Sequence, residues 1–156
     1  MSDNQDVGII SDTHGLLRVE AIEALKTVDL ILHAGDIGNP QVLKALRAVA
    51  PVVAVRGNVD KGEWAQKLRD WEVVEVGALY VYMLHDVNEI ELSPAEAGFQ
   101  IVVSGHSHKP LIEERRGVLY INPGSAGPRR FKLPVSIARL QVSGESANAQ
   151  LVELSV

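Results

Sequence analysis

Seven residues with metal-ligand side chains follow short apolar segments at five separate places in the chain. They are Asp12, His14, Asp36, Asn58, His85, His106 and His108. In open α/β sheets, ligands bind just beyond the carboxyl ends of the strands, so these side chains are expected to converge. Taken singly, each has a simpler reading, such as a helix N-cap for Asp12 or a turn residue for Asp36. Their shared placement favours one common site.

The spacing of these residues has a physical reason. Asp12 lies two residues before His14, and His106 two residues before His108. In an extended segment, residues at i and i+2 project to the same side, so each pair is predicted to act as a pincer. Glycine directly precedes three of the seven, which leaves room for crowding around one centre. Those three are Asp36, Asn58 and His106.

A metal is the simplest reason to gather carboxylates and imidazoles in one cleft, because without a cation they would repel and titrate abnormally. The chain has no cysteine, so the donors are nitrogen and oxygen. Imidazole, carboxylate and carboxamide together suit Mn, Fe or Zn. Seven ligands exceed one tetrahedral site, whereas two ions about 3.5 to 4 Å apart, bridged by one carboxylate, accommodate them.

The elements that must position these residues are short. Apolar runs of strand length are predicted at 7–10, 30–32, 52–55, 79–84 and 101–103. Helical spacing of apolar residues lies between the first three runs, at 16–27 and 42–49. This order predicts a β-α-β-α-β unit, whose parallel strands are buried on both faces.

The second half of the chain has the pattern of strand pairs joined by short turns. The pairs are 72–76 with 79–84, 111–114 with 118–121, and 135–142 with 149–154. A short helix is predicted within 61–71, because Trp64, Leu68 and Trp71 share one helical face, and another begins at Ser93-Pro94. We therefore predict one α/β domain spanning residues 1–156, with a mixed, two-layered sheet.

The composition and net charge of the chain limit the kinds of partner that it is expected to bind. The chain has 156 residues, is 46% hydrophobic and carries a formal net charge of -5. A chain this acidic is not expected to bind a nucleic-acid backbone or an anionic membrane, both of which need a basic face. The polar start MSDNQD and the lack of a membrane-length apolar run predict an untargeted cytoplasmic protein.

Taken in order, the motifs resemble those of the calcineurin-like metallophosphoesterases across almost the whole chain. They are Asp12-Thr-His14, Gly35-Asp36, Gly57-Asn58-x-Asp60, His85 and Gly105-His106-Ser107-His108. The late segment Asn122-Pro-Gly-Ser125, followed by Pro128-Arg129, is similar to the small bacterial and archaeal phosphodiesterase branch, which includes the retromer-subunit fold. The resemblance implies a two-layered mixed β-sheet sandwich flanked by helices.

The resemblance also implies roles. Asp12, His14, Asp36 and His108 would hold one divalent ion, and Asp36, Asn58, His85 and His106 a second, with Asp36 bridging. Manganese is the favoured ion, with Fe, Zn, Ni or Mg as alternatives. A bridging hydroxide would attack a phosphate ester in line with its leaving group. Asp36, Asn58, Asp60 and His85 are the predicted catalytic residues, with Asp60 orienting Asn58 or a metal-bound water.

Two positions depart from the family pattern. Val59 stands where larger phosphatases carry a histidine that protonates the leaving group, so esters with acidic leaving groups are expected to turn over best. Asp86 interrupts a triplet that the branch usually shows as His-Gly-His. Its carboxylate is expected to add negative charge beside the substrate.

Other residues receive structural interpretations. His33 is predicted to pack under the site, Trp64 and Trp71 to serve core or subunit contacts, and Arg129 to lie near a bound phosphate. The expected partners are a small phosphorylated substrate and a second copy of the chain in a homodimer. Two alternatives stay open: a non-catalytic interaction scaffold with a vestigial metal site, and a mononuclear hydrolase.

Overall fold

The first sheet is built around the predicted β-α-β-α-β unit. In the computed structural model, which describes residues 4–156, its strand order is β10-β9-β1-β2-β3. Strands β1, β2 and β3 pair in parallel, with Ile9 opposite Leu32 and Leu32 opposite Val53, while β9 and β10 are antiparallel. The strands are β1 (Asn4–Ile10), β2 (Leu30–His33), β3 (Val52–Ala54), β9 (Ser136–Ser143) and β10 (Ser146–Glu153).

The second sheet has the order β4-β5-β6-β8-β7. Its three central strands run parallel, and an antiparallel strand lies at each edge. The predicted strand pairs are present, each within a few residues of its expected ends. The strands are β4 (Trp71–Val76), β5 (Leu79–Leu84), β6 (Ile101–Val103), β7 (Leu111–Arg115) and β8 (Val118–Asn122).

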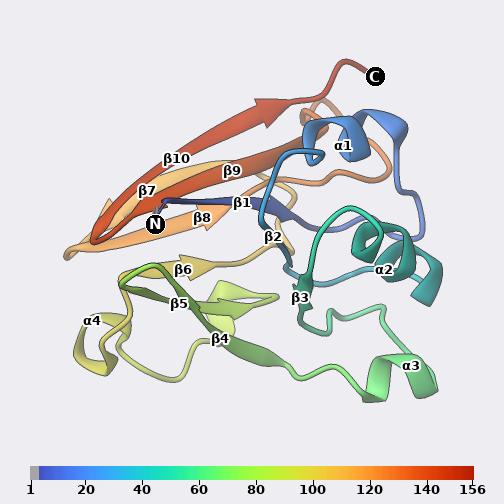
Figure 1. The fold of residues 1–156 in the computed structure, drawn as a ribbon. Helices are drawn as coiled ribbons and strands as arrows, with labels where there is room; N and C mark the ends of the chain where they lie inside the picture. Colours follow the sequence, from blue (N-terminus) through green and yellow to red (C-terminus); the bar gives the residue numbers. More distant parts are fainter. Residues whose placement is uncertain (1–3) are drawn as a thin grey trace.

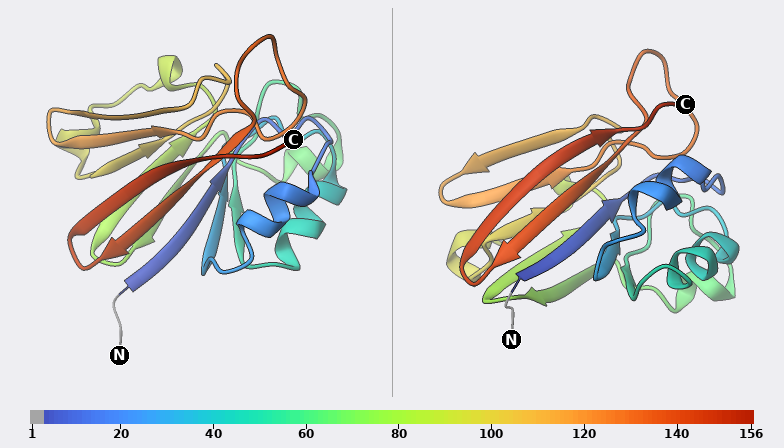
Figure 2. Two further views of the ribbon diagram at one scale, coloured as in Figure 1. Left: turned by 90° about the horizontal axis from the view of Figure 1, so that it is seen from above. Right: turned by 45° about the horizontal axis from the view of Figure 1, so that its top comes forward.

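The two sheets pack face to face, and helices cover the outer face of the first sheet (Figures 1 and 2). Alternation along β1 produces this layering, because Ile9 faces the second sheet while Ile10 faces the helices. Helices α1 (Val19–Ala24) and α2 (Pro40–Arg47) form the helical layer. Asn39 caps α2, since its side chain accepts a hydrogen bond from the Val42 amide. The predicted fold class is confirmed.

Two helix predictions were wrong in extent. The first helix is only α1, because residues 15–18 form the turn that carries the chain away from His14, and Leu17 reaches the core from that turn. The helix predicted within 61–71 shrinks to α3 (Glu63–Gln66). Trp71 instead begins β4, opposite Leu84, so it is half-exposed on a strand and is not part of the core.

Two short helical segments lie in the second half, η1 (Val87–Glu89) and α4 (Pro94–Ala97). Ser93 is the N-cap residue of α4 as predicted, but its side chain makes no capping hydrogen bond. Within residues 4–156, no helix has the length and apolar character needed to cross a membrane.

Candidate metal centre

The candidate site forms where strands of both sheets end. Asp12 follows β1, Asp36 follows β2, and His85 directly follows β5. His106 and His108 lie in the loop after β6. The first sheet therefore supplies the carboxylates and the second sheet supplies three imidazoles, and the convergence predicted from the strand ends is present for the residues described next.

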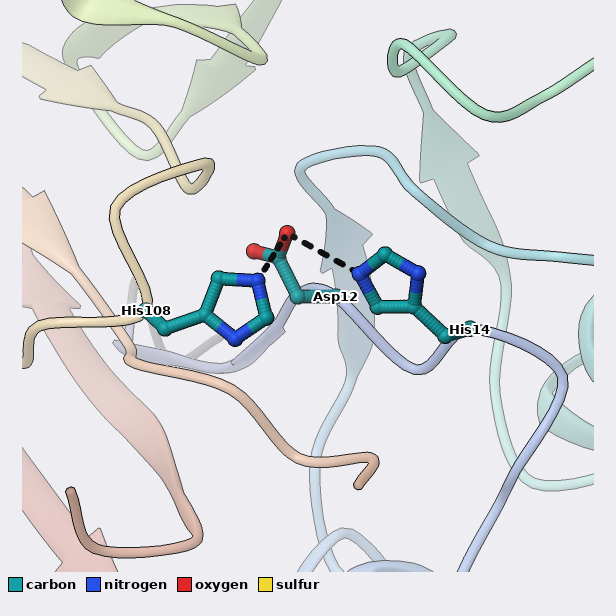
Figure 3. Close-up of side chains that lie close together, drawn as sticks. All are labelled: Asp12, His14 and His108. Carbon is teal, nitrogen blue, oxygen red and sulfur yellow. Dashed lines mark ion pairs between the residues drawn. The ribbon is translucent and has the colours of Figure 1, made fainter. Parts of the chain in front are cut away.

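Asp12 lies at the centre of three imidazoles. Its Oδ1 atom is 3.3 Å from His108 Nε2, 3.7 Å from His14 Nε2 and 4.0 Å from His85 Nε2. Figure 3 shows the rings of His14 and His108 approaching this carboxylate from opposite sides. The other oxygen, Oδ2, accepts hydrogen bonds from Ser11 Oγ at 2.6 Å and the His106 backbone amide at 3.1 Å. Asp12 thus has one oxygen fixed by the chain and one facing the imidazoles.

Asp36 lies between two of the imidazoles. Its Oδ2 atom is 3.2 Å from His85 Nε2 and 3.6 Å from His14 Nε2. Its Oδ1 atom accepts a hydrogen bond from the Val59 amide at 3.0 Å. One carboxylate therefore reaches both ligand sets implied by the family resemblance.

Four buried polar atoms in this cluster have no hydrogen-bond partner among the described residues. They are Asp12 Oδ1, His14 Nε2, His85 Nε2 and His108 Nδ1. Leaving such an atom unpaired costs about 1–3 kcal/mol. His85 Nδ1 donates to the Ala34 carbonyl at 2.7 Å, which turns Nε2 toward Asp36. Three of the four atoms, from Asp12, His14 and His85, face one another, so this cluster fits a divalent cation.

Two groups of residues have ligand atoms close enough to hold one ion each. The first is Asp12, His14 and His108, and the second is Asp12, Asp36 and His85. All five residues belong to the predicted set.

The ionisation of the cluster follows its charges. Burial raises the pKa of Asp12, but the imidazoles of His108 and His14 outweigh burial and hold it far below the usual range. Burial likewise raises the pKa of Asp36, but His85 and the Val59 amide outweigh burial and lower this pKa below its ordinary value. Burial lowers the pKa of His85, while Asp36 and Asp12 raise it above its ordinary value. The two carboxylates thus favour a positive charge between them, either on the imidazole of His85 or on a bound cation.

The backbone around the site is strained. Among residues 4–156, seven non-glycine residues have a positive φ, and five of them belong to the predicted ligand set. The five are Asp12, His14, Asp36, His106 and His108. Left-handed backbone costs roughly 1–2 kcal/mol for such residues. Strain concentrated here is typical of a functional site.

This backbone corrects the predicted extended pincers. Asp12 and His14 do converge, but through left-handed turns with φ of 55° and 46°. His106 and His108, with φ of 68° and 62°, do not share a target. His108 approaches Asp12, whereas His106 Nε2 lies 3.7 Å from Asp86 Oδ2.

The predicted role of glycine is confirmed. A Cβ at Gly57 would overlap the Asp36 backbone and carboxylate, and one at Gly105 would overlap Ser11 Oγ. A Cβ at Gly35 would come within 2.7 Å of His85 Nδ1. The loops can approach one another this closely only without side chains at these positions.

Two predicted ligands lie at the edge of the cluster. The His106 ring is 5.2 Å from the His85 ring, and its side chain is 42% exposed. Asn58 is exposed and lines the same cleft as His85 and Asp86. These two side chains face solvent, where they can reach an ion or a substrate.

The carboxylate of Asp60 binds backbone amides of two loops. Its two oxygens accept hydrogen bonds from the amides of Gly57 at 2.8 Å and Gly38 at 2.9 Å. It therefore fixes the loop that carries Asn58 against the loop that follows Asp36. The predicted role of Asp60 in orienting Asn58 or a metal-bound water stays a prediction, and these contacts hold the Asn58 loop in place.

His33 packs under the site, as predicted. Thr13 Oγ1 donates to the Ile37 carbonyl and so accepts from His33 Nε2 at 3.0 Å, while the Gly35 amide donates to Nδ1. Burial lowers the pKa of His33 to about 4, although the Asp12 carboxylate opposes this shift. The imidazole is a neutral brace between two loops.

The late motif supports the site in a way the sequence did not indicate. Asn122 Nδ2 donates to the Gly105 carbonyl at 2.9 Å and to Ser107 Oγ at 3.1 Å. Ser125 Oγ donates to the Asp12 carbonyl at 3.0 Å. Both residues hold the ligand loops. Arg129 lies in the exposed loop that follows.

The chain is similar in sequence to known proteins. Residues 6–145 match the sequence model of the calcineurin-like phosphoesterase superfamily domain. A probable metallophosphoesterase of Methanothermobacter thermautotrophicus is 34% identical over 157 residues, covering 94% of this chain and 91% of that protein.

Solved structures agree with these sequence matches. An archaeal phosphodiesterase has a TM-score of 0.78 and 26% identity, over 94% of this chain and 99% of that one. Vps29 of Entamoeba histolytica, determined with Zn²⁺, shares the fold with a TM-score of 0.74 and 21% identity, over 96% and 99% of the two chains.

Proposed function

Because the chain belongs to the calcineurin-like phosphoesterase superfamily, we propose that it is a metal-dependent phosphodiesterase with a dinuclear site. The observation that carries this proposal is the position of Asp36, whose Oδ2 atom lies between His14 and His85. A carboxylate placed in this way can bridge two ions. The unpaired atoms around it supply donors on both sides.

The two ligand sets follow from this bridge. Asp12, His14, Asp36 and His108 would hold one ion, and Asp36, Asn58, His85 and His106 the other. Two bound divalent ions would supply Lewis acidity and make a water nucleophilic near neutral pH. Manganese is our preferred ion, although Zn²⁺ suits the same imidazole and carboxylate donors.

The residues of the chain orient this centre. Ser11 and the His106 amide hold Asp12 Oδ2, so that Oδ1 would be available to bind an ion. The Ala34 carbonyl fixes the ring of His85, and Asp60 fixes the loop of Asn58. Asn58, exposed at the cleft, and His106, exposed beside Asp86, would be available to meet the phosphoryl oxygens.

The proposal includes a small phosphorylated substrate and a diester preference. We also retain the proposals of a cytoplasmic location and a homodimer. A non-catalytic scaffold is the less favoured alternative, because the five grouped ligands and their strained backbone serve chemistry better than they serve a docking face.

The direct test is metal-dependent hydrolysis of bis(p-nitrophenyl) phosphate beside p-nitrophenyl phosphate, with Mn²⁺ added to chelator-treated protein. We expect activity toward the diester to appear with the metal and to be lost in Asp36→Asn. Asp29→Asn is the matched control, because Asp29 lies at the other end of β2 and accepts one exposed backbone bond from Asp6. Retained activity in Asp36→Asn, or none in the metal-loaded wild type, would reject the proposal.

A further inference from the structure

A large cleft opens beside the candidate metal centre. It has a volume of about 780 Å³, and His85, Asn58 and Asp86 form its border with the site. This volume lies within the range of small-molecule pockets. Trp71 and Tyr82 form an aromatic wall of the same cleft. A molecule with its phosphate at His85 can therefore extend across this wall.

The aromatic wall is built in layers. Trp71 stacks on Tyr82 with ring centroids 5.8 Å apart and an interplanar angle of 22°. Phe99 supports Tyr82 from 5.2 Å away. Tyr82 is buried, but Trp71 is 47% exposed. Trp71 therefore keeps nearly half of its surface accessible at a position that lines the cleft.

The position of Trp71 is fixed relative to the metal ligands. It pairs with Leu84, the residue immediately before His85. The bridge between Val55 and Arg69 also holds the segment that precedes Trp71 against the segment that leads to Asn58. The aromatic surface and two of the proposed ligands thus belong to one rigid frame.

The charge of the cleft limits what it accepts. The guanidinium of Arg56 donates twice to Asp70 Oδ1, at 3.1 and 2.7 Å, so its positive charge is already paired. The remaining charged lining residues, Asp86, Glu89 and Glu91, are acidic. Burial, together with the carboxylate of Glu91, raises the pKa of Tyr82. A second phosphate in this cleft would meet repulsion.

We propose that the cleft is a subsite for a planar aromatic ring attached to the phosphate that reacts, with Trp71 as its stacking surface. This inference rests on the proposed function for the place of the phosphate. Ring N–H donors suit the acidic rim, so the substrate class is a nucleoside phosphodiester with a single phosphate. Polyphosphates are excluded from the cleft by charge.

The test compares two unreactive phosphonates by calorimetry on the Mn²⁺-loaded protein. Phenylphosphonate presents a ring and methylphosphonate does not, while their metal-binding groups are alike. We expect the phenyl compound to bind about tenfold more tightly to the wild type, as stacking on an aromatic side chain provides. In Trp71→Ala the ratio should fall to near one, and Trp71→Phe should keep most of it.

Tyr80→Ala is the matched control. Tyr80 is 44% exposed on β5 but does not line the cleft, so this variant should keep the wild-type ratio. Equal affinities in the wild type, an unchanged ratio in Trp71→Ala, or binding of neither phosphonate would overturn the assignment. So would a homodimer that dissociates in Trp71→Ala while the affinity ratio stays unchanged, since Trp71 would then be a subunit contact.

The outcomes separate this inference from the proposed function. A protein that shows the tenfold ratio without hydrolysing any diester retains the aromatic subsite and loses the proposed activity. A protein that hydrolyses bis(p-nitrophenyl) phosphate with equal phosphonate affinities keeps the activity and loses the subsite.

Discussion

Asp36 Oδ2 lies 3.2 Å from His85 Nε2, while His85 Nδ1 donates to the Ala34 carbonyl. The imidazole is held between a neutral acceptor and a carboxylate. Burial lowers its pKa, but Asp36 and Asp12 raise it above the ordinary value. Without metal, the raised pKa favours the protonated ring, with a positive charge in the place where a cation would sit.

Metal binding should release this proton. We expect the heat of Mn²⁺ binding at about pH 7 to depend on the ionisation enthalpy of the buffer, because His85 must become neutral to bind metal. Since the raised pKa is the source of the proton, the release should shrink as pH rises. In His85→Asn the number of protons released should be smaller than in the wild type. Binding heats that are the same in all buffers would contradict this prediction.

Replacing Asp60 should weaken the site through its backbone contacts. Asp60→Asn leaves one oxygen for two amide donors, so one partly buried hydrogen bond to a charged acceptor is lost, at a cost of about 1.5–3 kcal/mol. Urea denaturation should show this loss, and Mn²⁺ affinity should fall because the Asn58 loop is released. Asp29→Asn, which removes one exposed acceptor, should cost less than about 1 kcal/mol. Equal losses in the two variants would argue against the bracing role.

Val59 cannot donate a proton to the leaving group, and this gives a testable dependence of the rate on the leaving group. Its side chain is 46% exposed, and its amide donates to Asp36 Oδ1, a bond that any residue at this position retains. The wild-type rate should fall steeply as the leaving-group pKa rises from aryl to alkyl esters. Val59→His should flatten this dependence, since a general acid contributes about 10²–10⁴-fold. Val59→Ala is the control and should keep the steep slope; a flat wild-type series would refute the idea.

His33 should make stability depend on pH. In the folded chain burial lowers its pKa to about 4, against the ordinary 6.5. Below pH 6.5 the imidazole becomes protonated in the unfolded chain but stays neutral in the folded chain. The contribution of His33 to the free energy of unfolding is therefore fully present above pH 6.5 and falls as the pH drops toward 4. The loss should approach about 3 kcal/mol over this window. Urea denaturation of metal-free protein should show a shallower pH dependence for His33→Gln than for the wild type, and parallel curves would be the contrary result.

Much of this architecture could be predicted from short-range patterns. Apolar runs located the strands, and their ends located Asp12, Asp36 and His85 correctly. The Gly35, Gly57 and Gly105 positions indicated close approach of loops, which the structure bears out. These features are local in the chain, and the rule for strand ends brings them together.

The remainder depended on tertiary contacts. Left-handed backbone at Asp12 and His108 is imposed by the loops they contact, so i, i+2 spacing could not indicate it. Trp71 matches a helical face in the sequence, but pairing with Leu84 makes it a strand residue in the cleft. The brace from Asn122 to Gly105 spans 17 residues and has no local signature.

The central claim is that Asp36 joins two ion sites. An equilibrium titration of chelator-treated protein with Mn²⁺, read as bound ions per chain at saturation, tests it most directly. The account predicts two ions in the wild type and weakened binding of both in Asp36→Asn, because that carboxylate lies between His14 and His85. One ion per chain at saturation, or an Asp36→Asn variant that binds both ions as the wild type does, would contradict it.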